Sequence, residues 1–183
     1  PLFVRHCGNW LRPVTAAEKF WRWFMEACAG GRNVMLATGG TPEPPSQKNL
    51  NVRWIFSSSL TQHELHAYGS PRPYPSNGEV RLVIAARQEK AKGAGRVIQA
   101  LPILARTFPQ ITLDVLGHGS AIPEFKRLAG ELNVADRVTF TGQLGHDQVL
   151  QSLGNATVFV FPTTSSDGFP KAVLEGLATG LPV

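Results

Sequence analysis

Apolar and polar positions follow two patterns along the chain. Short apolar runs are typical of buried strands, whereas apolar positions three and four residues apart are typical of amphipathic helices. Strands are predicted over 1–5, 34–37, 52–56, 81–85, 111–116, 138–141 and 158–161, and helices over 15–28, 94–108, 122–132, 147–153 and 170–179. From residue 81 onward the two kinds alternate strictly, which predicts a parallel sheet with helices on both faces.

The first predicted helix opens with a capping box, because Glu18 follows Thr15 by three positions. Its apolar residues at helical spacing are Phe20, Trp23, Phe24, Ala27 and Cys28. We expect this face to pack in a core rather than to bind a ligand.

A segment rich in proline and glycine divides the chain. Residues 69–78 contain three prolines and two glycines, a composition typical of a linker. We therefore predict one α/β domain over 1–68, a linker over 69–80 and a second α/β domain over 81–183. Ligands of open parallel sheets bind beyond the carboxyl ends of the strands, so the site of the second domain is expected there.

The composition is that of a globular protein, with 43% hydrophobic and 17% charged residues among 183. Neither an apolar run long enough for a membrane span nor a charged and then apolar leader is present, which predicts a cytoplasmic location. Cys7 and Cys28 lack paired spacing and are expected to be buried thiols. The net charge of +5 is spread along the chain without a basic block, which argues against nucleic acid as a partner. A diphosphate pocket and attraction to an anionic membrane account for the charge equally well.

The last eighteen residues, SDGFPKAVLEGLATGLPV, carry the strongest chemical signal. They place Asp167 before a Gly-Phe-Pro turn and Glu175 on the helix that follows. A helix N-terminus offers unpaired N–H groups and a positive dipole end, so it can hold a phosphate while two carboxylates accept hydroxyls. The alternative is an ordinary surface helix in which Glu175 pairs with Lys171, four positions earlier.

A second constellation lies between the strand over 81–85 and the helix that follows it. Arg87 and Lys92 stand five positions apart on this loop, and Gly93 permits a close approach, so the two cations can neutralise a diphosphate. The alternative is a solvated loop in which Glu89 pairs with Lys90 or Lys92.

Together these segments resemble the retaining glycosyltransferases of the GT-B fold, family four (glycosyl transferases group 1). The family's G-R-L-x-x-x-K-G is matched by A-R-Q-E-K-A-K-G, and its E-G-F-P, V-L-E-A-L-A and G-x-P-V by D-G-F-P, V-L-E-G-L-A and G-L-P-V. The segments L-D-V-L-G-H-G-S, R-V-T-F-T-G-Q-L and A-T-V-F-V-F-P-T match in order, so the resemblance covers 81–183. Asp167 stands where the family usually has Glu, and Ala86 where it usually has Gly.

The resemblance implies two Rossmann-like domains and transfer of a sugar from a nucleotide-sugar donor to a saccharide or lipid-linked acceptor, with retained configuration. It assigns the leaving diphosphate to Arg87 and Lys92, sugar hydroxyls to Asp167 and ribose hydroxyls to Glu175. The turn and the backbone N–H groups are assigned to Gly168, Phe169 and Lys171. The nucleobase is assigned to Leu144 and the donor sugar to His6. It also implies a metal-independent reaction. A nucleotide-sugar epimerase of the same fold and a noncatalytic nucleotide-sugar-binding protein remain alternatives.

Two further motifs argue against cofactors. Gly117-His118-Gly119 is not a dinucleotide fingerprint, because Ile122 stands where the third glycine is expected, which argues against NAD. His63 and His66 lack a third ligand for a metal. The chain begins inside a predicted strand and stops where the family begins another, so both domains are expected to be truncated and the fragment alone to be inactive.

Overall fold

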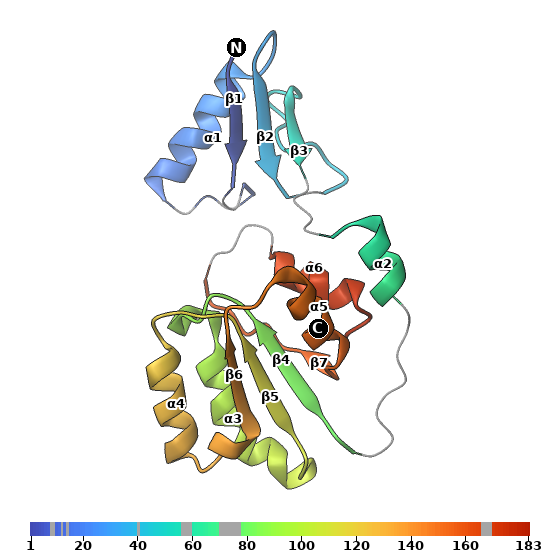
Figure 1. Ribbon diagram of the computed structural model, residues 1–183. Helices are drawn as coiled ribbons and strands as arrows, with labels where there is room; N and C mark the ends of the chain where they lie inside the picture. Colours follow the sequence, from blue (N-terminus) through green and yellow to red (C-terminus); the bar gives the residue numbers. More distant parts are fainter. Residues whose placement is uncertain are drawn as a thin grey trace. The chain divides into compact units, whose positions relative to one another are not determined.

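The computed structural model is α/β and consists of two compact units, each built on its own parallel sheet (Figure 1). It describes residues 1–7, 10–11, 13, 15–39, 41–55, 60–69, 78–165 and 170–183. The first unit falls within 1–59 and 166–171, and the second within 60–165 and 172–183. Helix α2 (Gln62–Tyr68) therefore groups with the second unit, unlike in the predicted division at residue 68, because Leu60 and Tyr68 pack against the core of that unit.

The first unit has three parallel strands in the order β1-β2-β3, with bounds β1 (Phe3–His6), β2 (Val34–Thr38) and β3 (Val52–Ile55). In their register, Phe3 lies opposite Val34 and Met35 opposite Val52. Helix α1 (Ala16–Cys28) begins with the predicted capping box, in which Thr15 and Glu18 bond reciprocally. The core consists of Trp10, Met25, Met35, Ala37 and Val52.

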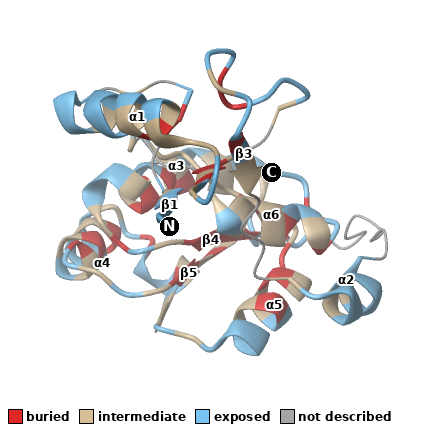
Figure 2. Ribbon diagram, turned by 90° about the horizontal axis from the view of Figure 1, so that it is seen from above, coloured by how far each residue is buried: buried red, intermediate tan, exposed pale blue. Residues whose placement is uncertain are grey.

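The face of α1 predicted to be buried is largely exposed. Phe20 and Trp23 are 52% and 61% exposed, and Figure 2 shows the exposed stretches of this helix. Met25, on the other side, is fully buried instead. The Arg22 guanidinium lies 5.4 Å from the centre of the Trp10 ring, which gives this polar residue of α1 a partner within the unit. The core expectation is therefore wrong for Phe20 and Trp23.

The second unit has four parallel strands in the order β6-β5-β4-β7. The bounds are β4 (Arg81–Ala85), η1 (Lys90–Lys92), α3 (Ala94–Thr107), β5 (Thr112–Leu116), α4 (Ile122–Glu131), η2 (Ala135–Arg137), β6 (Val138–Gly142), α5 (His146–Gly154), β7 (Val158–Phe159) and α6 (Lys171–Ala178). The predicted alternation of strands and helices is confirmed.

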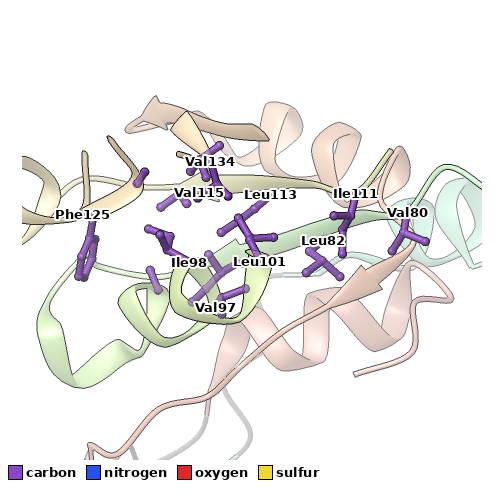
Figure 3. Packing of buried hydrophobic residues seen from close by; sticks show 14 of the residues in the cluster. Val80, Leu82, Val97, Ile98, Leu101, Ile111, Leu113, Val115, Phe125 and Val134 are labelled. Atoms are coloured by element: carbon purple, nitrogen blue, oxygen red, sulfur yellow. The ribbon is translucent and has the colours of Figure 1, made fainter. Parts of the chain in front are cut away.

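Both faces of this sheet are buried. Leu82 and Ile84 of β4 pack with α3 and α4 in one cluster, part of which Figure 3 shows. Val83 and Ala85 point to the opposite face and pack with residues of α5, α6 and α2. Because alternate residues of a strand point to opposite faces, a strand covered on both sides is apolar throughout. This explains the continuous apolar run of β4.

The order of the strands locates the switch point of the sheet. β4 has β5 on one side and β7 on the other, so the chain leaves the centre in both directions. In such sheets, ligands bind beyond the carboxyl ends of the strands where the order reverses. Here the loops after β4 and β7 flank that position.

Two further expectations concern membranes and cysteines. None of the described helices combines the length and the hydropathy that a bilayer crossing requires. Cys7 is exposed and Cys28 half-buried, and both are free thiols, so burial was wrongly predicted for Cys7.

Candidate nucleotide-sugar site

Arg87 and Lys92 lie on the loop after β4, at the carboxyl edge of the sheet. Arg87 is exposed, whereas Lys92, the last residue of η1, is half-buried. Lys92 Nζ donates to Ser165 Oγ at 3.0 Å, on the segment that follows β7. Lys90, between the two cations, pairs with Glu124 of α4 at 2.7 Å. The two predicted diphosphate ligands are therefore held on one loop at the switch point.

Backbone contacts bring the loops after β4 and β7 together. Ala91 O accepts from Thr164 N at 2.8 Å and from Thr163 Oγ1 at 3.2 Å. Gly93 has φ of 91° and starts α3, and a Cβ there would lie 2.3 Å from Pro162 O. Only glycine fits this combination of left-handed backbone and close approach. Lys92 and Gly93 thus hold the loop after β4 against the segment after β7.

Glu89 binds neither neighbouring lysine, contrary to the solvated-loop alternative. Its carboxylate accepts from Ser120 Oγ at 2.6 Å and from Ser120 N at 3.4 Å. The pKa of the Glu89 carboxyl lies below its ordinary value, chiefly because of the Ser120 hydroxyl and then the Ser120 amide, with smaller contributions from the charges of Arg87 and His118. This bond connects the loop after β4 to the turn after β5.

Gln88 is fully buried beneath the same loop. Its Nε2 donates to Ala86 O at 3.0 Å and to Leu116 O at 2.7 Å, at the carboxyl ends of β4 and β5. A Cβ on Gly117 would lie 2.2 Å from Ala86 O, and one on Gly119 would lie 2.3 Å from Gln88 O. These two glycines therefore allow the turn after β5 to approach the loop after β4, which gives them a structural role.

Helix α6 carries Glu175 and is seated on β7. A Cβ on Gly176 would lie 3.1 Å from Phe159 Cγ, so the helix packs closely against the strand. Gly180, with φ of 72°, follows the helix, and Leu181 N bonds to Gly176 O, which confirms the predicted stop at this glycine. The Glu175 side chain is 12% exposed. The packing of α6 against β7 thus determines where the Glu175 side chain lies.

The loop between β6 and α5 brings two more side chains to this edge. Leu144 is partly buried and packs against the cluster that contains Val83 and Ala85. This contact is also expected if Leu144 has a packing role alone. His146, the first residue of α5, has Nε2 2.9 Å from Glu64 Oε1 and Nδ1 3.9 Å from Glu175 Oε1. The His146 imidazole thus lies between carboxylates from two different helices.

The predicted site residues are not all brought together by the structure. Arg87, Lys92, Leu144 and Glu175 belong to the second unit, where their elements end or begin at the carboxyl edge of the sheet. Lys171 is the first residue of α6. His6 is the last residue of β1 in the first unit. Its ring meets the Trp10 ring edge to face, with 5.4 Å between the ring centres. Asp167, Gly168 and Phe169 lie outside the described residues.

A cavity of about 490 Å³ lies at the opposite end of the second unit's sheet. It is lined by Arg81 and Thr112 at the starts of β4 and β5, and by Thr157 just before β7. Ligand sites of parallel sheets form at the carboxyl ends, so we do not assign it to the donor. Among the described residues, no group of three His, Cys, Asp or Glu side chains forms a metal site.

Sequence reasoning missed Glu64, Gln88, His146 and Ser165. Gln88 carried a signal, because it stands where the resembling family has Leu, and a polar residue at an apolar position indicates a specific bond. His146 lies two positions after Leu144, but its two partners are far away in sequence. Spacing could not have predicted their contact.

Comparisons with known proteins identify the family of the chain. The family model for glycosyl transferases group 1 matches residues 71–183. The phosphatidyl-myo-inositol mannosyltransferase of Mycobacterium tuberculosis is 30% identical over 110 residues, covering 60% of this chain and 28% of that protein. The lipopolysaccharide 1,6-galactosyltransferase of Escherichia coli is 32% identical over 112 residues, covering 60% of this chain and 31% of that protein.

The fold is also found among solved structures. Anabaena HepE in complex with UDP superposes with a TM-score of 0.66 at 16% identity, covering 100% of this chain and 52% of that one. The chain spans less than a third of the length of the two sequence relatives. Because the family model matches more than half of its residues, including the whole loop after β4 and helix α6, the chain belongs to the glycosyl transferases group 1 family.

Proposed function

We propose that this protein transfers a sugar from a nucleotide-sugar donor to an acceptor with retention of anomeric configuration. The position of Arg87 and Lys92 at the switch point of the sheet supports this most strongly. Two cations there stabilise the charge that develops on the leaving diphosphate. By analogy with oxyanion holes, loss of one such donor raises the barrier by about 3 to 4 kcal/mol.

The nucleoside part of the donor is assigned to α6 and to the loop after β6. Glu175 accepts ribose hydroxyls, since its carboxylate on α6 is largely desolvated and charge-assisted hydrogen bonds are stronger than neutral ones. Leu144 offers an apolar surface and backbone atoms to the nucleobase. Both assignments follow from the family and from the common edge of the sheet.

The sugar and the phosphates are assigned to residues that precede or begin α6, and to the first unit. Asp167 is assigned to the sugar hydroxyls, and Gly168 to the donor site, as the family motif implies. The N–H groups of Phe169 and Lys171 add to the diphosphate site, while Pro170 has no N–H to donate. His6, at the carboxyl end of β1, is assigned to the donor sugar. No metal is required by this arrangement.

The acceptor is proposed to be a saccharide or a lipid-linked sugar. Two relatives act, by name, on phosphatidyl-myo-inositol and on lipopolysaccharide. A net charge of +5 favours contact with anionic lipid, so we place the enzyme peripherally at the inner face of a membrane. The proposed donor domain corresponds to 81–183, and the proposed acceptor-side domain to the residues that precede α2, since α2 groups with the second compact unit.

The reaction is tested by incubating the intact protein with a panel of nucleotide-sugars and acceptors and identifying products by mass spectrometry. Transfer to an acceptor, with the anomeric configuration of the product determined by NMR, supports the proposal. Interconversion of the free donor would indicate an epimerase instead. Binding without turnover would indicate a noncatalytic protein.

The diphosphate site is tested separately by calorimetry with UDP and GDP. Arg87→Ala and Lys92→Ala should each weaken binding by about 1 to 3 kcal/mol. Lys90→Ala is the matched control, because Lys90 lies on the same loop but pairs with Glu124. Undiminished binding by the Arg87/Lys92 double variant, with unchanged circular dichroism, would contradict the assignment.

A further inference from the structure

His146 connects two helices through its two ring nitrogens. The Nε2 contact with Glu64 of α2 is at hydrogen-bond distance, 2.9 Å. The distance from Nδ1 to Glu175 Oε1 of α6 is 3.9 Å, which is a contact but too long for a hydrogen bond. All three residues belong to the second unit. A side chain assigned to the donor is therefore in contact with a histidine that no motif identified.

Glu64 is itself held in place by the capping box of α2. Its Oε2 accepts from Thr61 N at 2.6 Å and from Thr61 Oγ1 at 2.8 Å, which leaves Oε1 for His146. The pKa of the Glu64 carboxyl is lowered by the Thr61 amide first, then by the Thr61 hydroxyl and by His146. The imidazole is thus oriented by a carboxylate whose own direction is set by the backbone.

The position of the His146 ring limits how the Glu175 carboxylate can turn. The Glu64 and Glu175 side chains are only 16% and 12% exposed, so both carboxylates are largely buried beside the ring. Because Glu64 fixes the ring through Nε2, the ring in turn restricts the space open to the Glu175 carboxylate. Without the ring, the Glu175 side chain would gain rotational freedom, and its carboxylate would no longer present the same oxygen to a ligand.

We infer that His146 is a positioning residue that holds Glu175 in the orientation in which its carboxylate accepts the ribose hydroxyls of the donor. This inference rests on the proposed role of Glu175. Orienting an acceptor before the ligand arrives increases affinity because less side-chain freedom is lost on binding. The effect should therefore be confined to ligands that carry ribose hydroxyls.

A purely structural role for His146 would have a different signature. Helix α2 is also attached to the second unit by Leu60 and Tyr68, which pack against the same cluster as α5 and α6. If His146 only helped to dock α2, its loss would lower the unfolding midpoint and affect all nucleotides alike. The two roles are distinguished by comparing nucleotides with and without ribose hydroxyls.

The experiment measures binding of UDP and GDP and of their 2′,3′-dideoxy forms by calorimetry. The wild-type protein should prefer the ribose form of its nucleotide, and His146→Ala should reduce this preference about fivefold to tenfold while leaving the affinity for the dideoxy form unchanged. His146→Gln, which keeps a donor for Glu64 and resembles the native size, should show the same loss. His63→Ala, an exposed histidine on α2, is the control and should behave like wild type.

The double variant gives the decisive comparison. In a Glu175→Gln background, His146→Ala should have no further effect on the preference, because the residue through which it acts has already lost its charge. If the wild type binds both forms equally, or binds neither UDP nor GDP, the ribose role of Glu175 in the proposed function fails. If the wild type prefers ribose and both His146 variants keep that preference, or lose affinity for both forms equally, the proposed function stands and the inference about His146 is overturned.

Discussion

Lys92 Nζ lies 3.0 Å from Ser165 Oγ, which joins the loop after β4 to the segment after β7, 73 positions further along the chain. The same two segments are joined by Ala91 O and Thr164 N. Since β4 and β7 are neighbours at the switch point of the sheet, this contact spans the position where ligands of such sheets bind. A diphosphate bound by Lys92 would therefore meet a cation that is already oriented.

Removing the Ser165 hydroxyl should disturb that orientation without removing the cation. Ser165→Ala is expected to weaken binding of UDP or GDP by about 0.5 to 1.5 kcal/mol, less than Lys92→Ala does. Calorimetry measures both. Ser152→Ala, which removes a hydroxyl that bonds only to Gln148 O within α5, serves as the control. An effect of Ser165→Ala as small as that of the control would separate Ser165 from the site.

Gly93→Ala should destabilise the protein strongly. The new Cβ would lie 2.3 Å from Pro162 O on a backbone with φ of 91°, so both a clash and backbone strain arise. The expected loss of unfolding free energy is about 2 to 4 kcal/mol, measured by urea denaturation. Gly130→Ala is the matched control, because Gly130 lies in α4 with open space around it and should gain about 0.5 to 1 kcal/mol. Similar midpoints for the two variants would contradict the close approach.

Gln88 offers a comparison of two substitutions. Gln88→Ala removes two buried hydrogen bonds and leaves space, so it should lower stability by about 1 to 3 kcal/mol. Gln88→Leu should be less harmful, because it refills the space and also removes Oε1, a buried atom that has no hydrogen-bond partner among the described residues. Thermal and urea unfolding measure which of the two variants is more stable. A more stable Ala variant than Leu variant would contradict this account.

The bond between Glu89 and Ser120 predicts a pH dependence. The pKa of the Glu89 carboxyl is lowered in the folded protein, mainly by the Ser120 hydroxyl, so the ionised form contributes stability above the pKa of the unfolded state. That contribution is lost as the pH falls through the lower, folded-state value. Urea midpoints at pH 7 and at about pH 3.5 should therefore differ less in Ser120→Ala than in wild type. Equal differences in the two proteins would argue against the bond.

Much of the fold follows from local patterns. The alternation of strands and helices after residue 81 is confirmed, as are the capping box at Thr15 and the stop of α6 at Gly180. These features depend on residues a few positions apart, whose spacing is visible in the sequence. The position of Arg87 and Lys92 on a loop at the carboxyl edge follows in the same way, because every strand of a parallel sheet ends at one edge.

Other features depended on how distant segments pack. The aromatic face of α1 is amphipathic by spacing, but spacing does not decide which side meets the sheet, and Met25 is buried in place of Trp23. Helix α2 precedes the predicted linker in sequence, yet its packing places it with the second unit. The sequence predicted helix α1 but not its buried face, and α2 is not among the predicted helices.

The sequence by itself determined the order of strands and helices after residue 81, the family and the residues that its motifs contain. The tertiary structure alone decided that Lys92 meets Ser165, that Glu89 binds Ser120 and not a neighbouring lysine, and that His146 lies between Glu64 and Glu175. The physical reason is that short-range spacing sets local backbone geometry, whereas a side chain chooses its partner among all groups that the packed sheet and helices bring within reach.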